Sequence, residues 1–378
     1  YKRQVMTRRR LKNTLTVLFG LALASLGVYN IVLKATWTLM DDGVFWKAAP
    51  QGLVASRIDP GGPGSRAGVQ GGDILLAVDG QEVLTRADLE STLASREAGE
   101  LASYKLLRED GRREINLPVE PLPKGDVSGF YYLSLVGFFS LVVGTVVMLR
   151  RPADRSTLHF YAICVLFFLT YSVSYTGKLS VADWGLFWLD AMARLFLPVV
   201  FLHFCLTFPE RRLRAQRLWL VPALYMPALV LAGAVAMSQA LGMAGEGTGA
   251  LWGIVEAIDR FQPLYFAVFF AMAFAALRDS YRRTRSLTAR RQVKWLVWGT
   301  GGAVVPFLAF YALPFALGRE PGLAMKLAGY VPLALIPLSL AYAVVKHRLM
   351  DVELIVRRAL GFVLAVAVLI AAALLTAG

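Results

Sequence analysis

Few residues of this chain have the types and spacing of a catalytic or metal-binding site. Histidine occurs three times, at His159, His203 and His347. The sequence contains no His-Glu-x-x-His pair, the helical arrangement that holds zinc in metalloproteases. The best match to a serine nucleophile, Gly177-Lys-Leu-Ser180, falls in a loop without a histidine partner. We therefore expect no catalytic residue, no metal site and no cofactor in these 378 residues.

One charged pair stands inside an apolar stretch. Asp190 and Arg194 are four residues apart between Trp184 and Phe208, a spacing that puts both on one face of a helix. Because an isolated charge is costly within a membrane, we expect the two to pair and to face the interior of a helix bundle. Two interpretations stay open: a structural contact that holds two helices together, or a ligand or signal-relay site.

The charged pair lies in a chain that has the composition and the long apolar stretches of a membrane protein. The chain is 57% hydrophobic and 17% charged, far from the composition of a soluble domain. Nine stretches have few or no charges, and most reach the roughly 20 residues that cross a bilayer. They are 13–33, 127–149, 156–177, 184–208, 218–245, 261–277, 295–318, 327–345 and 359–378.

The basic residues behind the net charge of +14 are unevenly distributed among the segments that connect these stretches. The N-terminal tail and alternate loops hold 24 Lys and Arg residues, whereas the short loops of the other side hold four. The positive-inside rule therefore predicts a cytoplasmic N-terminus in a bacterial inner membrane. The charge is explained by topology and contact with the lipid bilayer, so we expect no nucleic-acid partner.

The number of spans predicts that the chain is incomplete. Nine crossings that start in the cytoplasm end outside, and the last, 359–378, has no polar stop after it. We expect a tenth span and a cytoplasmic domain beyond Gly378. The predicted organisation is a basic tail (1–12), an uncleaved transmembrane anchor (13–35), an extracytoplasmic domain (36–125), a seven-helix membrane bundle (127–345), a cytoplasmic linker (346–358) and a truncated last helix (359–378).

The extracytoplasmic segment 36–125 has the pattern of a small α+β domain. Two linked motifs stand out, Pro-Gly-x-Pro-x-x-x-Ala-Gly-Val over 60–69 and Gly-Asp-Ile-Leu-x-x-Val-Asp-Gly over 72–80. Ser65 is expected to cap a short helix that ends at Gly68, and Thr85 with Asp88 to form a capping-box variant at the start of an amphipathic helix. Strands are expected at 53–58, 74–78, 101–108 and 113–119.

These motifs resemble those of bacterial PDZ domains over about 85 residues. The resemblance implies that an extended peptide adds a strand in a groove floored by the longer helix. It places the groove at Gly43, Val44, Phe45, Trp46, Leu89 and Leu93, with 43–46 as the carboxylate-binding loop. The alternative is that these are core residues. Phe45 replaces the loop's second glycine, and Asp41 and Asp42 precede it, so we expect an internal or lipid-bearing peptide or a purely structural domain.

Two shorter segments, Leu202–Glu210 and Tyr342–Arg358, are similar to parts of polytopic bacterial sensor proteins. The whole layout resembles the sensor half of membrane histidine kinases of the competence-pheromone type. That resemblance implies a homodimer, and an output domain that is a histidine kinase or else a serine phosphatase or a cyclase.

The sequence thus predicts an all-α membrane bundle of about nine helices with an inserted PDZ domain. Its expected function is to detect an extracytoplasmic peptide or protein and to signal to a cytoplasmic output domain. The alternatives are a non-catalytic PDZ-bearing scaffold or accessory subunit and, more remotely, a regulator of membrane proteolysis.

Overall fold

The computed structural model describes residues 2–36, 38, 40–49, 52–108, 110–121, 128–150, 155–176, 181–208, 220–243, 249–284, 286–319 and 321–345. The chain divides into two compact units. One holds the α-helices that follow and precede a small domain, and the other holds that domain, residues 36–126, together with 176–183. The expected linker 346–358 and last helix 359–378 lie outside the described residues.

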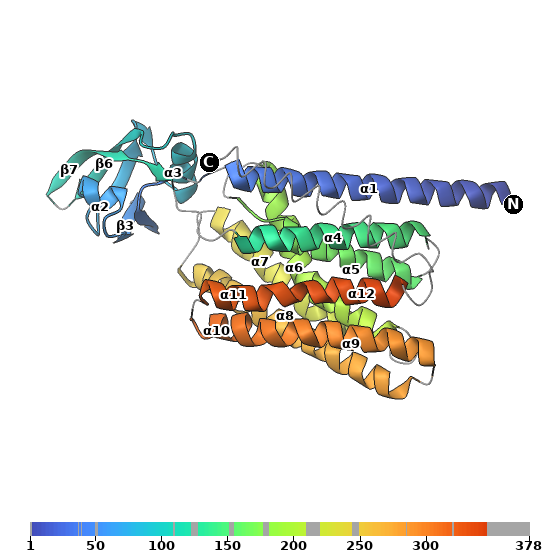
Figure 1. Cartoon of the computed structure of the whole chain (residues 1–378). Coiled ribbons are helices and arrows are strands. Elements are labelled where there is room, and N and C mark those ends of the chain that lie inside the picture. The colour runs from blue at the N-terminus through green and yellow to red at the C-terminus, as the bar shows by residue number, and fades with distance from the viewer. Residues whose placement is uncertain are drawn as a thin grey trace. The chain divides into compact units, whose positions relative to one another are not determined.

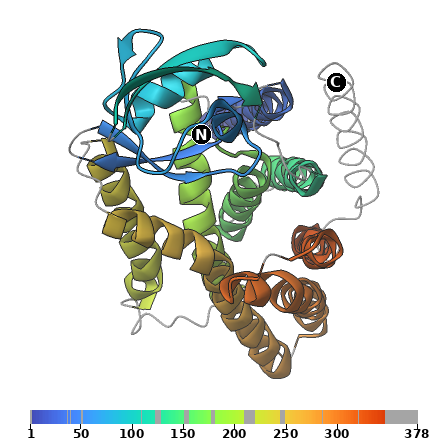
Figure 2. The same cartoon turned by 90° about the vertical axis from the view of Figure 1, so that its left-hand side faces the viewer.

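The helical unit consists of long helices that run side by side (Figure 1), and Figure 2 looks nearly along their axes. In chain order they are α1 (Lys2–Thr36), α4 (Ser128–Arg150), α5 (Arg155–Ser172), α6 (Val181–Thr207), α7 (Leu220–Met243), α8 (Gly249–Arg283) and α9 (Leu287–Phe307). A π-helical turn (Leu308–Ala312), α10 (Leu313–Ala316), α11 (Leu323–Tyr330), a 3₁₀ turn (Val331–Ala334) and α12 (Leu335–Val345) follow.

The helix lengths agree with most of the expected membrane spans. Within the described residues, seven helices are long and apolar enough to cross a bilayer: Arg10–Thr36, Gly129–Arg150, Val181–Thr207, Leu220–Ala240, Phe261–Arg283, Arg290–Ala316 and Leu323–Leu340. The expected span 156–177 is a shorter apolar helix, Thr157–Ser172. The structure therefore supports a membrane protein with several apolar helices and does not fix their number at nine.

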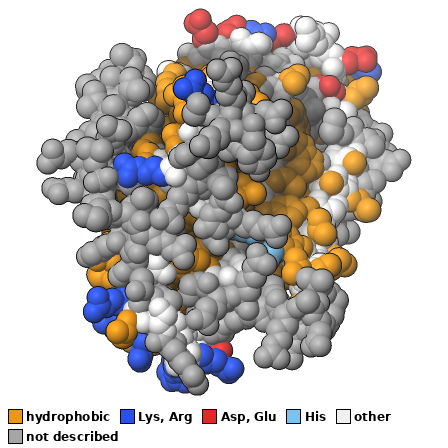
Figure 3. Space-filling view, turned by 90° about the vertical axis from the view of Figure 1, so that its right-hand side faces the viewer, with side chains coloured by type: hydrophobic (Ala, Val, Ile, Leu, Met, Phe, Trp, Pro, Cys, Tyr) orange, Lys and Arg blue, Asp and Glu red, His pale blue; other side chains and the backbone are white. Residues whose placement is uncertain are grey.

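Basic residues gather at one end of the helical unit. The start of α1, the end of α4 and the turn from α8 to α9 meet there (Figure 1). Lys and Arg side chains lie at the rim of this end, around apolar side chains (Figure 3). The basic residues on the described helix ends include Arg10, Lys12, Arg150, Arg282, Arg283 and Arg290.

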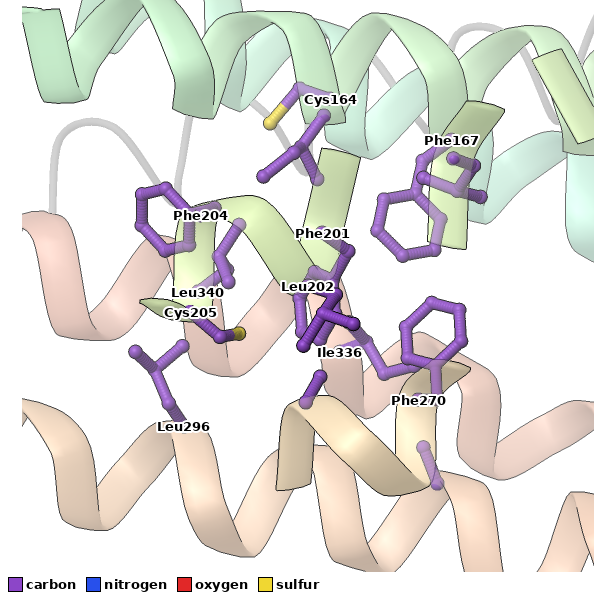
Figure 4. Packing of buried hydrophobic residues seen from close by; sticks show 14 of the residues in the cluster. Cys164, Phe167, Phe201, Leu202, Phe204, Cys205, Phe270, Leu296, Ile336 and Leu340 are labelled. Atoms are coloured by element: carbon purple, nitrogen blue, oxygen red, sulfur yellow. The ribbon is translucent and has the colours of Figure 1, made fainter. Parts of the chain in front are cut away.

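Helix α6 supplies much of the buried core of the helical unit. Its side chains Phe201, Leu202, Phe204 and Cys205 lie among residues of α5, α8, α9 and α12 (Figure 4). Over half of its most apolar stretch is buried, the largest share among the long spans. Both cysteines, Cys164 and Cys205, are buried and form no disulfide.

The small domain contains a six-stranded sheet with the order β2-β3-β4-β6-β7, and β5 pairs with β4. All these neighbours are antiparallel. The strands are β2 (Val44–Ala49), β3 (Gly52–Ile58), β4 (Ile74–Val78), β5 (Gln81–Glu82), β6 (Leu101–Arg108) and β7 (Gly111–Pro118). Helix α2 (Pro63–Ala67) follows β3, and α3 (Arg86–Ala94) follows β5.

A separate pair of short strands holds the two ends of the domain together. Strand β1 (Met40–Asp41) pairs antiparallel with β8 (Glu120–Pro121), with Met40 opposite Pro121 and Asp41 opposite Glu120. The chain therefore enters and leaves the domain at neighbouring points.

One helix start differs from the sequence prediction. Helix α2 begins at Pro63 with Gly62 as its N-cap, so the prediction that Ser65 caps it is wrong. Proline is favoured in the first turn because its fixed φ suits a helix and its missing N–H needs no partner. The predicted end at Gly68 is confirmed, since this residue is in the left-handed conformation (φ 86°).

Candidate functional site

Strand β2 carries the residues expected to bind a peptide, and it lies at an edge of the sheet. Val44 is paired with Ile58 at one end and Ala49 with Gly52 at the other. In the part of the chain that the structure describes, no strand pairs with the other edge of β2. An edge strand offers unpaired backbone groups to a further strand, so β2 has the position that β-augmentation requires.

The loop before β2 is held by the buried carboxylate of Asp42. Its Oδ1 accepts a hydrogen bond from the backbone N–H of Val44 (2.9 Å). Its Oδ2 accepts from the indole Nε1 of Trp46 (2.7 Å) and from the hydroxyl of Tyr104 (3.0 Å). Asp42 is 1% exposed, and burial raises its pKa even though these three donors oppose the shift.

Close packing against α2 fixes the same loop. Gly43 has φ +69°, and a Cβ added there would lie 2.9 Å from Cδ of Pro63. A Cβ on Gly64 would lie 2.3 Å from Cγ2 of Val44 and 3.0 Å from the carbonyl oxygen of Asp42. The N–H of Gly64 also donates to that carbonyl (2.8 Å). Glycine is needed at both positions, one for its backbone conformation and one for space.

Side chains of β2 alternate between the domain core and its surface. Val44 and Trp46 are buried in the core cluster, where Trp46 stacks near Tyr104 with ring centroids 6.4 Å apart. Phe45 is 48% exposed, and Lys47 is exposed as well. The guanidinium of Arg57 on β3 lies 5.7 Å from the centre of the Phe45 ring.

The longer helix contributes the other expected groove residues. Leu89 and Leu93 of α3 are 3% and 4% exposed and belong to the same core cluster as Val44 and Trp46. The predicted capping box is confirmed: the N–H of Asp88 donates to Oγ1 of Thr85 (3.2 Å), and the N–H of Thr85 donates to Oδ2 of Asp88 (2.9 Å). The cap sets where α3 starts and therefore which of its side chains face β2.

A buried ion pair anchors the second motif. Asp73 is 1% exposed, and its two oxygens accept hydrogen bonds from Nε and Nη2 of Arg108, each at 2.7 Å. The backbone N–H of Gln70 also donates to it (2.8 Å). Burial alone would raise the pKa of Asp73, but the bonds from Arg108 and Gln70 outweigh it and lower the pKa.

The membrane pair expected from the sequence forms within α6. Nε of Arg194 donates to Oδ1 of Asp190 (2.8 Å), and Nη2 contacts Oδ2. Asp190 is buried, but the Arg194 side chain is 41% exposed. The structure thus brings the two together and encloses the carboxylate more than the guanidinium.

In the helical unit, His159 and His203 lie close to each other. Within the described residues no group of three His, Cys, Asp or Glu side chains gathers. His203 Nδ1 lies 3.0 Å from the hydroxyl of Tyr225, and its ring is 5.2 Å from that of His159.

The sequence reasoning missed a polar contact between α1 and the end of α5. Asn30 is fully buried; its Nδ2 donates to the carbonyl of Ser174 (2.8 Å), and its Oδ1 accepts from the N–H of Ser174 (3.1 Å). Nζ of Lys34 donates to the Ser174 hydroxyl (2.8 Å) and lies 4.3 Å from the centre of the Phe130 ring. An asparagine within an apolar span was the available signal, because such a side chain needs a partner.

Comparison with known proteins identifies the small domain. Residues 54–102 match the family model described as PDZ domain. A probable periplasmic serine endoprotease DegP-like from Pseudomonas fluorescens is 31% identical over 77 residues, which are 20% of this chain and 16% of that protein. Its counterpart from Halomonas elongata is 34% identical over 74 residues, again 20% and 16% of the two chains. The chain thus spans about a sixth of the length of these relatives.

Solved structures match a similar share of this chain. The HtrA-type protease AlgW with a decapeptide matches 23% of this chain and 30% of its own, with 23% identity and a TM-score of 0.22. A serine endoprotease from Yersinia pestis matches the same shares with 21% identity and a TM-score of 0.21. Together, the matched residues and the apolar helices identify the chain as a membrane protein with a PDZ domain.

Proposed function

We propose that this chain is the sensing part of a bacterial inner-membrane signalling protein, in which the PDZ domain binds an extracytoplasmic peptide or protein. The observation that carries the proposal is that the edge strand β2 lies close in sequence to a membrane helix. Helix α1 ends at Thr36, β1 begins at Met40 and β2 begins at Val44. A ligand that orders β2 therefore acts on the segment that leads directly to α1.

The paired ends of the domain support transmission to two helices at once. Strand β1 follows α1, β8 precedes α4, and the two strands are hydrogen-bonded to each other. In the helical unit, Lys34 near the end of α1 lies over the ring of Phe130 near the start of α4. A shift of the β1–β8 pair would consequently be felt by α1 and α4 together.

Helix α4 also touches the helices that lead toward the expected linker at 346–358. The Tyr132 hydroxyl donates to the carbonyl of Val331 (2.9 Å), at the 3₁₀ turn between α11 and α12. In a 3₁₀ turn the carbonyls accept from the residue three positions later, and Tyr132 donates a further hydrogen bond to this one. This contact supports a route from α4 to α12 and on to a cytoplasmic output domain, for which we propose a histidine kinase in a homodimer.

Ligand binding can drive this response only if the ligand favours one of two helix arrangements over the other, since equal affinity shifts no population. The test uses membrane vesicles from cells that express the full-length gene product, with or without residues 42–121. Spent culture medium serves as the source of stimulus, and transfer of phosphate from ATP to the protein is measured. We expect the deletion to abolish the response to medium while basal phosphorylation persists.

An unchanged response in the deleted protein would move sensing from the PDZ domain to the helical unit. A gene that stops after Gly378, with no phosphorylation in either form, would instead favour a scaffold or accessory subunit that docks partners through the PDZ domain.

A further inference from the structure

The turn before β2 already contains a carboxylate. In a turn that captures a chain end, backbone N–H groups donate to the terminal carboxylate of the ligand. Here the N–H of Val44 donates to Oδ1 of Asp42 at 2.9 Å. A ligand carboxylate at this point would have to compete with an internal one that is part of the same turn.

Asp42 is held too firmly to be displaced at low cost. Its two oxygens accept three hydrogen bonds, from Val44, Trp46 and Tyr104, and the side chain is buried. Moving it would leave three donors without a partner inside the domain, and an unsatisfied buried donor is costly. A second carboxylate beside Asp42 would add repulsion between like charges.

The rest of β2 still suits a strand-adding ligand. Beyond the blocked turn β2 runs on to Ala49, and among the described residues no strand pairs with its outer side. On its inward face, Leu89 and Leu93 of α3 belong to the same buried apolar cluster as Val44 and Trp46. On its outward face, Lys47 is exposed and Arg57 lies beside the exposed ring of Phe45.

We propose that the β2 edge binds an internal, extended segment of a polypeptide, not a chain terminus, with apolar side chains facing α3 and acidic side chains facing Lys47 and Arg57. The acidic preference follows from cross-strand pairing, in which opposite charges on neighbouring strands attract. This inference rests on the proposed peptide-binding function of the PDZ domain and adds the class of ligand.

The experiment uses the full chain in lipid nanodiscs and two random peptide libraries. One library displays its peptides with a free C-terminus, and the other displays them between two folded proteins. Selected sequences are then synthesised in two forms, with a C-terminal carboxylate and with a C-terminal amide, and their Kd values are compared. We expect binders from the internal library, with amide forms that bind as well as or better than the acids.

Asp42→Ala tests the role of the internal carboxylate. It frees the N–H of Val44 and removes a negative charge, so affinity for the acid relative to the amide should rise about tenfold, the size expected for one charge-assisted hydrogen bond. Asp41→Ala is the matched control, because it removes a neighbouring charge without freeing that N–H. The control should change the ratio by less than about threefold.

The outward charges are tested separately with the selected peptides. Lys47→Glu and Arg57→Glu should each weaken peptides with acidic outward positions, and peptides in which Lys replaces those acidic residues should bind the wild type more weakly. A selection that returns only basic residues at these positions would overturn the charge assignment.

The outcomes separate this inference from the proposed function. If the wild type binds acids at least tenfold more tightly than amides, the domain captures chain ends; the inference then fails and peptide binding stands. If neither library yields a binder, both fail. Because the comparison of acid and amide uses the wild type, the result holds even if Asp42→Ala does not fold.

Discussion

Asp42 and Asp73 of the PDZ domain and Asn30 of the helical unit are all buried polar side chains, but they differ in where they lie and in what they bond to. In the domain, carboxylates lie inside the hydrophobic core and are saturated with donors, as Asp42 and Asp73 are. In the helical unit, the buried asparagine Asn30 lies near the end of its helix, where the partner is the backbone just past α5. The difference shows two uses of a buried polar group: one specifies a loop conformation, and the other fixes how far one helix slides along another.

If this contrast is correct, the largest loss of stability should come from the domain's ion pair. Asp73→Ala removes three hydrogen bonds and leaves Arg108 with its bond to the carbonyl of Gly68 but without the carboxylate. We expect the free energy of unfolding of the domain to fall by about 3 kcal/mol. Hydrogen–deuterium exchange of 101–118 in the full chain measures this loss.

The exposed pair Asp110 and Arg113 provides the matched control for that substitution. Asp110→Ala should change the same exchange rates by less than a factor of about five, since exposed ion pairs contribute little to stability. Equal effects of the two substitutions would remove the distinction between the buried carboxylate and the surface one.

A smaller loss of stability is expected where the loop before β2 packs on α2. Gly64→Ala places a methyl group 2.3 Å from Cγ2 of Val44, so the loop must shift. Overpacking of this kind costs about 1–3 kcal/mol, and peptide affinity should fall with stability. Thermal unfolding and peptide titration check both. Gly71→Ala is the control, because a Cβ there meets nothing within 4 Å.

In the helical unit, Asn30→Leu should lower the free energy of unfolding by about 1 kcal/mol, because interhelical hydrogen bonds in membranes are individually weak. The diagnostic result is positional: cysteines at the facing ends of α1 and α5 should crosslink with altered register, while the exchange rates of the domain remain unchanged. Tyr29→Leu, at a neighbouring position that is 47% exposed, should leave the crosslinking pattern as in the wild type.

The smallest predicted effect is a pH dependence of the domain, to which the two carboxylates contribute with opposite sign. The pKa of Asp73 is lowered, so its stabilising contribution is present above the ordinary value of 3.8 and is lost as pH falls through the lower, folded-state pKa. The pKa of Asp42 is raised, so its contribution weakens as pH rises from 3.8 toward the higher, folded-state pKa. In urea unfolding followed by hydrogen exchange, the free energy of unfolding of Asp73→Asn should fall less steeply at acid pH than that of the wild type. An unchanged slope would contradict the lowered pKa of Asp73.

Local sequence signals predicted the elements of the PDZ domain well. Strands β4 and β6 have the expected bounds, and the capping box at Thr85 and the Asp79-Gly80 turn form as expected, with Asp79 at φ 51° and Gly80 at φ 81°. These features depend on neighbouring residues alone, because alternation, capping and left-handed turns are encoded within a few positions. The PDZ resemblance likewise placed β2 beside α3.

Features that depend on distant residues were not predictable in the same way. Asp42 was expected to present its charge to a ligand, yet its partner Tyr104 lies 62 residues later and draws the carboxylate inward. Asn30 meets Ser174 across 144 residues. The groove assigned to Gly43–Trp46, Leu89 and Leu93 stays a prediction, since burial of Val44, Trp46 and both leucines suits a core role as well as the floor of a groove.

The pairing of β1 with β8 bears on how such a protein could arise. Opposed residues of an antiparallel pair lie about 5 Å apart, so the whole PDZ domain occupies a gap in the chain that a single short connection could close. A gene could gain, lose or exchange such a module without rerouting the helices on either side. The same helical unit could in this way be combined with PDZ domains of other binding specificities, and a chimera with another PDZ domain joined at Asp41 and Glu120 is the natural way to build one.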